Sequence, residues 1–369
     1  MKKLVIVSEK TRGHFQSGIT LLKGFEVVHF YKDTFSDMVI NESDPNFVRY
    51  SGVVDLYRKL KQQKPDLVQP LEPYYGYSRF RLPIKVLPIM FTTYYYCRAN
   101  KVPYFVHFLE NITPRVKYGW PFYLIMQKIG TMITGGASLL FWVNQGAKKN
   151  IELLGGGKKS KFGLWGIWGV DPAKYKPVED FDPSLILFVG RVTAQKGVFD
   201  LIEVMKLVSR QNPSAKLKIV GTGDADEQVG AIISSQGLED KVSLVGEVPD
   251  DQVVKYYQQA AIVVVPSKTL RYSAEQVGMV IIEAMACGKP VVAYNSGSIN
   301  EFVKNLETGF VVRESDVVGM ANQIVRLLGD KQIYKPMSEK SRQEAKARFD
   351  QRKNVVQLEE EITRLVSCR

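Results

Sequence analysis

The chain has 369 residues, which is too long for one ordinary hydrophobic core and predicts two domains. Hydrophobic residues make up 45% and charged residues 24%, a composition typical of a soluble globular protein. The formal net charge of +12 is carried by residues 1–180, so the first half could face nucleic acid, an anionic substrate or an acidic membrane. Three widely separated cysteines form no metal or disulfide motif, which favours a reducing, cytoplasmic compartment.

The first half predicts the short strands of an α/β fold. The apolar run Leu4–Val7 is typical of a buried parallel strand. The loop Ser8–Ser17 follows it, at the edge where open α/β sheets bind ligands, although Gly13 alone is a weak signal for a phosphate. Further strands are predicted at 26–31, 66–69, 103–108 and 138–143, and a helix is predicted at 53–63.

Aromatic and basic residues are interleaved between Tyr74 and Lys128. This mixture suits a membrane interface, and it also suits single-stranded nucleic acid through stacking and charge. For any single segment we favour a third interpretation, in which helices pack their aromatic residues inward. The apolar span from Trp120 to Val143 is interrupted by Gln127 and Lys128, so we expect peripheral membrane contact at most.

The second half alternates strands and helices at short intervals. Strands are predicted at 185–189, 217–220, 242–245 and 262–265, several of them ending in glycine, and this pattern is typical of a doubly wound parallel sheet. We place the domain boundary in the proline-containing linker, which gives domains of residues 1–172 and 173–349. A terminal helix at 350–369 is expected to pack back on the first domain.

The stretch Ser273–Glu301 contains two glutamates eight positions apart, Glu275 and Glu283, with Gly278 between them. A helix that starts at Gly278 offers backbone N–H groups and a positive dipole end to a phosphate. Ionised carboxylates accept hydrogen bonds from sugar hydroxyls. Together these features indicate a sugar-nucleotide pocket; the alternative is a surface helix with solvated glutamates.

Three further positions are candidates for chemistry. Arg191 follows a predicted strand and Lys196 begins the next helix, so the two cations could clamp a diphosphate; otherwise they are solvated surface charges. His107 ends an apolar strand, where a histidine is as often structural as functional. The acidic pair Asp224 and Asp226 stands at a helix start, which favours a structural role over a metal site.

The motifs of the second half resemble those of retaining glycosyltransferases of family 4, which have the GT-B fold of two Rossmann-like, doubly wound domains facing a cleft. The resemblance covers most of residues 181–303 and rests on L-F-V-G-R-V-T-A-Q-K-G, I-V-G-T-G, V-S-L-V-G-E-V-P, V-V-V-P-S and E-x7-E before A-M-A-C-G-K-P-V-V-A. The first half matches weakly, and only Gly13 stands where the family usually has a glycine pair.

The resemblance implies a role for each candidate residue. Arg191 and Lys196 would hold the donor diphosphate, Glu283 the ribose hydroxyls and Glu275 the donor sugar. His107 would lie near the reacting sugar, which makes Lys196, Arg191, Glu275 and His107 the expected catalytic residues. The remaining donor contacts would come from Gly221 and Val248 near the base and from the backbone of Gly278, Met279, Val280 and Ile281.

The sequence therefore predicts transfer of a hexosyl group, with retention, from a nucleotide diphosphate sugar to a saccharide or lipid-linked acceptor. No metal, cofactor or nucleic acid is expected, and an anionic membrane surface is a possible partner. Two alternatives stay open. One is a non-catalytic partner subunit that binds nucleotide sugars. The other is a dinucleotide-dependent oxidoreductase, although no G-x-G-x-x-G follows a strand.

Overall fold

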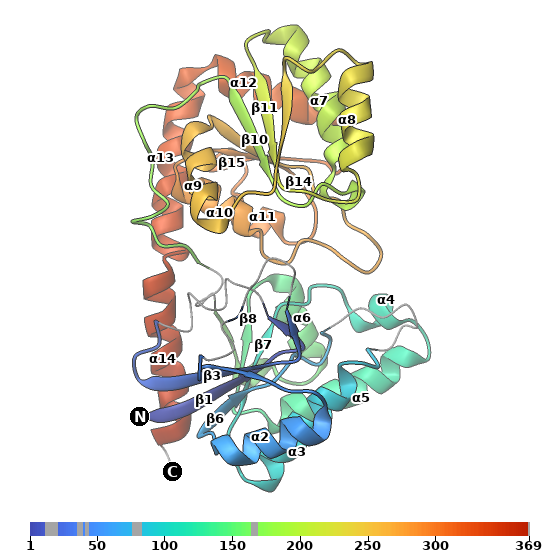
Figure 1. Ribbon diagram of the computed structural model, residues 1–369, viewed down its shortest axis with the longest axis vertical. Coiled ribbons are helices and arrows are strands. Elements are labelled where there is room, and N and C mark those ends of the chain that lie inside the picture. Colours follow the sequence, from blue (N-terminus) through green and yellow to red (C-terminus); the bar gives the residue numbers. More distant parts are fainter. Residues whose placement is uncertain (12–20, 35–39, 41–43, 76–82, 164–168, 368–369) are drawn as a thin grey trace. The chain divides into compact units, whose positions relative to one another are not determined.

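The structure is a computed structural model that describes residues 1–11, 21–34, 40, 44–75, 83–163 and 169–367 (Figure 1). The loop predicted to follow the first strand lies outside the described residues beyond Thr11. The chain divides into two compact units. Unit 1 consists of residues 1–168 and 351–369, and unit 2 consists of residues 169–350. The sequence-based boundaries stand after residues 172 and 349.

Unit 1 is built on parallel strands. Four of them form one sheet in the order β5-β3-β1-β6, and three more form the order β7-β8-β9. A parallel bridge between Val68 and Tyr104 joins the end of the first group to the second. The strands are β1 (Lys2–Val7), β3 (Phe25–Tyr31), β5 (Phe47–Arg49), β6 (Leu67–Gln69), β7 (Phe105–Phe108), β8 (Leu139–Trp142) and β9 (Ser160–Phe162). The two-residue strands β2 (Lys10–Thr11) and β4 (Asp33–Thr34) pair separately.

The helices of unit 1 contain many of its aromatic residues, some of them buried and some exposed. The helices are α2 (Val53–Gln63), α3 (Leu87–Ala99), α4 (Pro114–Tyr118), α5 (Phe122–Gly136), α6 (Gln145–Leu153) and α14 (Gln351–Ser367). Tyr74, Tyr96 and Tyr118 are buried in the core, as the inward-packing interpretation predicts. Tyr95 and Trp120, by contrast, are 63% and 71% exposed. Among the described residues, no helix combines the length and the hydropathy needed to cross a membrane.

Unit 2 contains one parallel sheet of six strands in the order β12-β11-β10-β13-β14-β15. The strands are β10 (Leu185–Val189), β11 (Lys216–Val220), β12 (Val242–Gly246), β13 (Ile262–Val265), β14 (Val291–Tyr294) and β15 (Gly309–Val312). Every residue of β13 and β14 is buried, because helices cover both faces of a parallel sheet. The prediction of an α/β fold with a parallel sheet is confirmed.

The helices of unit 2 alternate with these strands (Figure 1). They are α7 (Val198–Gln211), α8 (Asp226–Ser235), α9 (Asp250–Gln259), α10 (Met279–Ala286), α11 (Ile299–Phe302), α12 (Val317–Gly329) and α13 (Lys331–Arg348). The short helix η2 (Ala194–Lys196) precedes α7. The order of the sheet changes direction at β10, where β11 lies on one side and β13 on the other. Such a switch point opens a crevice at the carboxyl ends of the strands, which is the place where this class of sheet binds ligands.

The last helix, α14, belongs to unit 1 although it follows unit 2 in sequence. Its apolar face, Leu358, Ile362 and Val366, packs in one core cluster with Leu4 and Phe25 of β1 and β3. The Glu359 carboxylate accepts hydrogen bonds from the backbone N–H groups of Lys23 and Gly24, at 3.0 and 2.6 Å. Burial and these polar contacts together fix α14 on the sheet of unit 1.

Replacing Ile362 by alanine is expected to destabilise unit 1 by about 2 to 5 kcal/mol, because the side chain is fully buried and its removal leaves a cavity. The measurement is hydrogen exchange of backbone amides, which should lose protection in β1 and β3 while those of unit 2 keep theirs. Val356→Ala on the same helix is the control; Val356 is 56% exposed, so an effect within about 0.5 kcal/mol is expected. Equal loss of protection in both units would contradict the assignment of α14 to unit 1.

Candidate functional site

Two glycines allow the loops at the carboxyl ends of the unit 2 strands to come together. A Cβ on Gly197 would lie 1.9 Å from the carbonyl oxygen of Pro266, and one on Gly297 would lie 2.3 Å from that of Glu275. Both glycines also have left-handed backbones, with φ of 74° and 57°. The backbone N–H of Ser298 then donates to the Glu275 carbonyl at 2.9 Å. The loops after β10, β13 and β14 are therefore held in direct contact.

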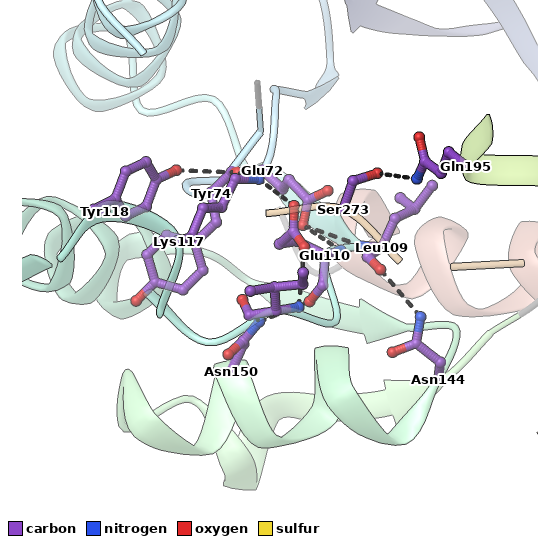
Figure 2. A network of polar contacts seen from close by, with 11 residues as sticks. Glu72, Tyr74, Leu109, Glu110, Lys117, Tyr118, Asn144, Asn150, Gln195 and Ser273 are labelled. Atoms are coloured by element: carbon purple, nitrogen blue, oxygen red, sulfur yellow. Dashed lines mark hydrogen bonds and ion pairs between the residues drawn. The ribbon is translucent and has the colours of Figure 1, made fainter. Parts of the chain in front are cut away.

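This contact brings Lys196 and Glu275 together. The Lys196 Nζ lies 2.7 Å from Glu275 Oε2, and the Ser267 hydroxyl donates to the same oxygen at 3.2 Å. The side chains of Lys196 and Glu275 are 25% and 17% exposed, so the pair is reachable from solvent. Figure 2 shows a second link between these loops, from Gln195 Nε2 to the Ser273 hydroxyl at 2.8 Å. Both charged residues were predicted from the sequence, but their pairing was not.

Glu283 lies inside α10 and is held by two tyrosine hydroxyls. Tyr257 of α9 donates to Oε2 at 2.7 Å, and Tyr175 donates to Oε1 at 3.3 Å. Burial raises the pKa of Glu283 to about 7, although both hydrogen bonds act to lower it. Sequence reasoning missed the two tyrosines, because 108 and 26 residues separate them from Glu283. Tyr175 lies in the proline-containing linker, which indicated a domain boundary and gave no signal for a carboxylate partner.

The remaining predicted donor contacts lie at neighbouring strand ends. Arg191 is exposed and follows Gly190, the first residue after β10. Gly221 follows β11, and its N–H donates to the Gly246 carbonyl at 2.8 Å; the half-buried Val248 comes two residues after Gly246 in the sequence. The helix α10 begins after Gly278, which brings no capping side chain. Of the first residues of α10, Met279 and Val280 are partly buried and Ile281 is fully buried.

In unit 1, His107 of β7 is 4% exposed, and its Nε2 donates to the carbonyl oxygen of Gly163 at 3.1 Å. Burial lowers the pKa of His107 to about 4, so the ring is neutral at physiological pH. This geometry gives the ring a backbone partner within unit 1. Asp226 of the acidic pair in unit 2 has a local contact, since its Oδ2 accepts from the N–H of Gly223 at 2.9 Å.

Unit 1 also contains a buried charge network that the sequence did not predict (Figure 2). Glu72 follows β6, Glu110 follows β7, and Lys117 of α4 forms an ion pair with Glu110 and donates to the Tyr74 carbonyl at 2.8 Å. Glu72 Oε2 accepts from the backbone N–H groups of Leu109 and Glu110, at 3.1 and 3.2 Å. Burial, reinforced by the charge of Glu110, raises the pKa of Glu72 to about 8. No group of three or more His, Cys, Asp or Glu within the described ranges has metal-binding geometry.

Comparison with known proteins shows a family similarity in unit 2. The family described as glycosyl transferases group 1 matches residues 172–344. An uncharacterized glycosyltransferase of Haemophilus influenzae is 33% identical over 158 residues, 42% of this chain and 43% of that protein. The amylovoran biosynthesis glycosyltransferase AmsK of Erwinia amylovora is 30% identical over 201 residues, 53% of this chain and 49% of AmsK. Each match therefore spans less than half of the relative's own length.

Solved structures share the fold of the whole chain. Sucrose-phosphate synthase from Thermosynechococcus elongatus superposes with a TM-score of 0.76 at 19% identity, over 100% of both chains. Anabaena HepE, solved in complex with UDP, superposes with a TM-score of 0.73 at 19% identity, again over 100% of both. This likeness agrees with the GT-B type of α/β fold expected from the sequence. The similarity to the glycosyl transferases group 1 family thus covers residues 172–344 of this chain.

Proposed function

We propose that this chain is a retaining glycosyltransferase that moves a hexosyl group from a nucleotide diphosphate sugar to a saccharide or lipid-linked acceptor. The observation that carries the proposal is the Lys196–Glu275 ion pair, with its Nζ–Oε2 distance of 2.7 Å, at the carboxyl edge of the unit 2 sheet. It combines a cation for a diphosphate with a carboxylate for sugar hydroxyls. Glu283, on the second turn of α10, supplies a second acceptor for the ribose.

The ion pair supports a specific exchange on donor binding. Before the donor binds, Glu275 neutralises Lys196, and the diphosphate of the donor would then take over the lysine. Glu275 is thereby released to accept hydrogen bonds from the donor sugar. Retention without an enzyme nucleophile requires the diphosphate to leave on the face that the acceptor approaches, so negative charge grows on the leaving oxygen. A fixed cation beside that oxygen stabilises the transition state more than the ground state.

Known proteins similar to this chain support the substrate classes. HepE was solved with UDP, with UDP and glucose, and with UDP-glucose, and AmsK is named for amylovoran biosynthesis. A nucleotide sugar donor and a saccharide acceptor are accordingly the substrates we propose for this chain. Arg191 and Lys196 would supply the positive charge that the leaving diphosphate needs, and on this ground we propose that the reaction needs no divalent metal.

The exposed residues of α4, of α5 and of the turn between them support a peripheral membrane location for the acceptor. Val116, Trp120, Leu124 and Ile125 are between 43% and 71% exposed. Arg115 and Lys128 are exposed on the same two helices. Apolar and aromatic side chains with flanking cations fit the interface of an anionic bilayer. We therefore propose that unit 1 binds an anionic membrane surface through α4 and α5.

Lys196→Ala is expected to lower the single-turnover rate at saturating donor by about a hundredfold or more, the scale for removing one preorganised electrostatic stabiliser. Lys196→Arg should restore little, because a planar fork does not reproduce a point charge at one place. Glu275→Gln should slow transfer and yet strengthen binding of the bare nucleoside diphosphate, because Lys196 no longer has a competing anion. Calorimetry measures the binding and rapid quench measures the rate.

Lys206→Ala is the control for these variants, since Lys206 is a surface lysine of α7 paired with Glu203. A Lys196→Ala enzyme that loses donor affinity but keeps its single-turnover rate would show that the lysine only holds the donor. Wild-type protein that binds the donor without transferring sugar to any acceptor would favour the non-catalytic partner subunit instead.

Transfer activity is expected to survive treatment with a chelator, because the proposed cations belong to the protein. The measurement compares initial rates before and after EDTA and gel filtration. Complete loss of activity that returns with manganese would overturn metal independence and direct attention to Asp224 and Asp226.

Membrane binding is tested by flotation with liposomes of phosphatidylcholine alone or with phosphatidylglycerol. We expect capture by the anionic liposomes only, and release at high salt, because the attraction is partly electrostatic. Trp120→Ser should reduce capture, since this side chain is 71% exposed. Equal recovery with neutral and anionic liposomes would refute the proposed surface.

A further inference from the structure

We infer that Tyr175 and Tyr257 are positioning residues that orient the Glu283 carboxylate for the ribose hydroxyls of the donor nucleotide. The inference rests on the proposed function and extends it to two residues with no expected role. Both act through Glu283 and are not placed on the reacting atoms. Their contribution is the direction and the ionisation state of one carboxylate.

Each oxygen of the Glu283 carboxylate accepts a hydrogen bond from one tyrosine. The Tyr257 hydroxyl donates to Oε2 at 2.7 Å and the Tyr175 hydroxyl donates to Oε1 at 3.3 Å. An ionised carboxylate has about four acceptor sites, so one tyrosine on each oxygen leaves one site on each for a ribose hydroxyl. The two rings meet edge to face, with their centroids 6.2 Å apart. The two vicinal hydroxyls of a ribose therefore match the two Glu283 oxygens, each of which has one acceptor site left.

Both tyrosines are themselves held in place. Tyr257 is fully buried and Tyr175 is 9% exposed, so neither ring can turn freely. Arg342 of α13 donates from Nη1 to the Tyr175 carbonyl at 2.6 Å and also to the carbonyl of Ala286, and from Nη2 to the Pro172 carbonyl at 2.9 Å. Ala286 is the last residue of α10, which carries Glu283. One guanidinium group thus fixes both the segment that carries Tyr175 and the helix that carries its partner.

The surroundings of Glu283 make its ionisation depend on the two tyrosine hydroxyls. Burial pushes the pKa of Glu283 upwards, Asp250 pushes in the same direction, and Lys174 opposes them. The Cys287 thiol also faces this group, but burial raises its pKa to about 12, so it stays neutral. The two tyrosine hydroxyls stabilise the charged carboxylate. They lower the pKa of Glu283 more than Lys174 does, and so hold it near 7 against the effect of burial. Without them more of Glu283 would be protonated at neutral pH and would lose acceptor sites.

The test compares Tyr257→Phe and Tyr175→Phe with Tyr256→Phe, a partly exposed neighbour on α9 whose hydroxyl makes no described contact with Glu283. The probes are a ribonucleoside diphosphate, chosen as whichever of UDP, GDP and ADP the wild-type protein binds, and its 2′,3′-dideoxy form. Calorimetry between pH 5.5 and 9 gives the affinity of each probe. Phenylalanine keeps the ring and removes only the hydroxyl, so packing is preserved.

For Tyr257→Phe we expect binding of the ribonucleoside diphosphate to weaken by about tenfold, the scale of one hydrogen bond to a charged group. Binding of the dideoxy form should not change. In the wild type, affinity for the ribose form should rise with pH through about 7, as Glu283 ionises. In both variants this rise should move to higher pH, because the lost hydrogen bond favoured the charged form. Tyr256→Phe should behave as the wild type.

Equal weakening of both probes with no shift in pH would mean that the tyrosines only pack, and the inference would be wrong. It would be wrong as well if neither variant differed from the wild type. Tyr175→Phe provides the test should Tyr257→Phe fail to fold. A wild type that binds no nucleoside diphosphate at all would instead defeat the proposed function, which is a distinguishable result.

Discussion

The close approach of two loop backbones is the constraint on which the site depends. At Gly197 and at Gly297 a neighbouring carbonyl oxygen occupies the space where any other residue would place its Cβ, at 1.9 and 2.3 Å. Larger residues would push apart the loops that follow β10, β13 and β14. Lys196 stands next to the first glycine, and Glu275 supplies the carbonyl against the second. The ion pair between their side chains is a consequence of this backbone contact.

The exposure of that ion pair determines what it can do. A pair whose side chains are 25% and 17% exposed is screened by water, so it adds little to the free energy of folding. For the same reason it can be broken at small cost when a competing anion arrives. A fully buried pair, such as Lys117 with Glu110 in unit 1, is not exchangeable in this way, because removing one partner leaves a buried charge. The Lys196–Glu275 pair therefore suits an exchangeable contact, whereas the Lys117–Glu110 pair suits a permanent attachment of α4.

Much of the fold could be predicted from the sequence because strands of a parallel sheet are continuous apolar runs, and Ile262–Val265 is one that ends where predicted. Lys196 was found because it precedes a helix after a strand end, and Glu275 and Glu283 because they flank the helix start at Gly278. Their partners were not, since nothing in periodicity says that Tyr257 or Tyr175 would reach Glu283. The Glu72 network was missed for a similar reason: isolated acidic residues in loops carry no pattern, and only the folded chain shows that Glu72 accepts backbone hydrogen bonds.

The position of α14 has a consequence for how the protein is made. Unit 1 lacks Leu358, Ile362 and Val366 until the whole of unit 2 has been synthesised. At about 5 to 20 residues per second, the ribosome needs roughly 10 to 40 s for residues 169–369. By the time residue 350 has been added, unit 2 has all of its strands, whereas Leu4 and Phe25 of unit 1 still lack the helix that covers them. Unit 1 is thus completed after unit 2, and until then part of its apolar core stays uncovered, the condition in which folding intermediates are prone to aggregate.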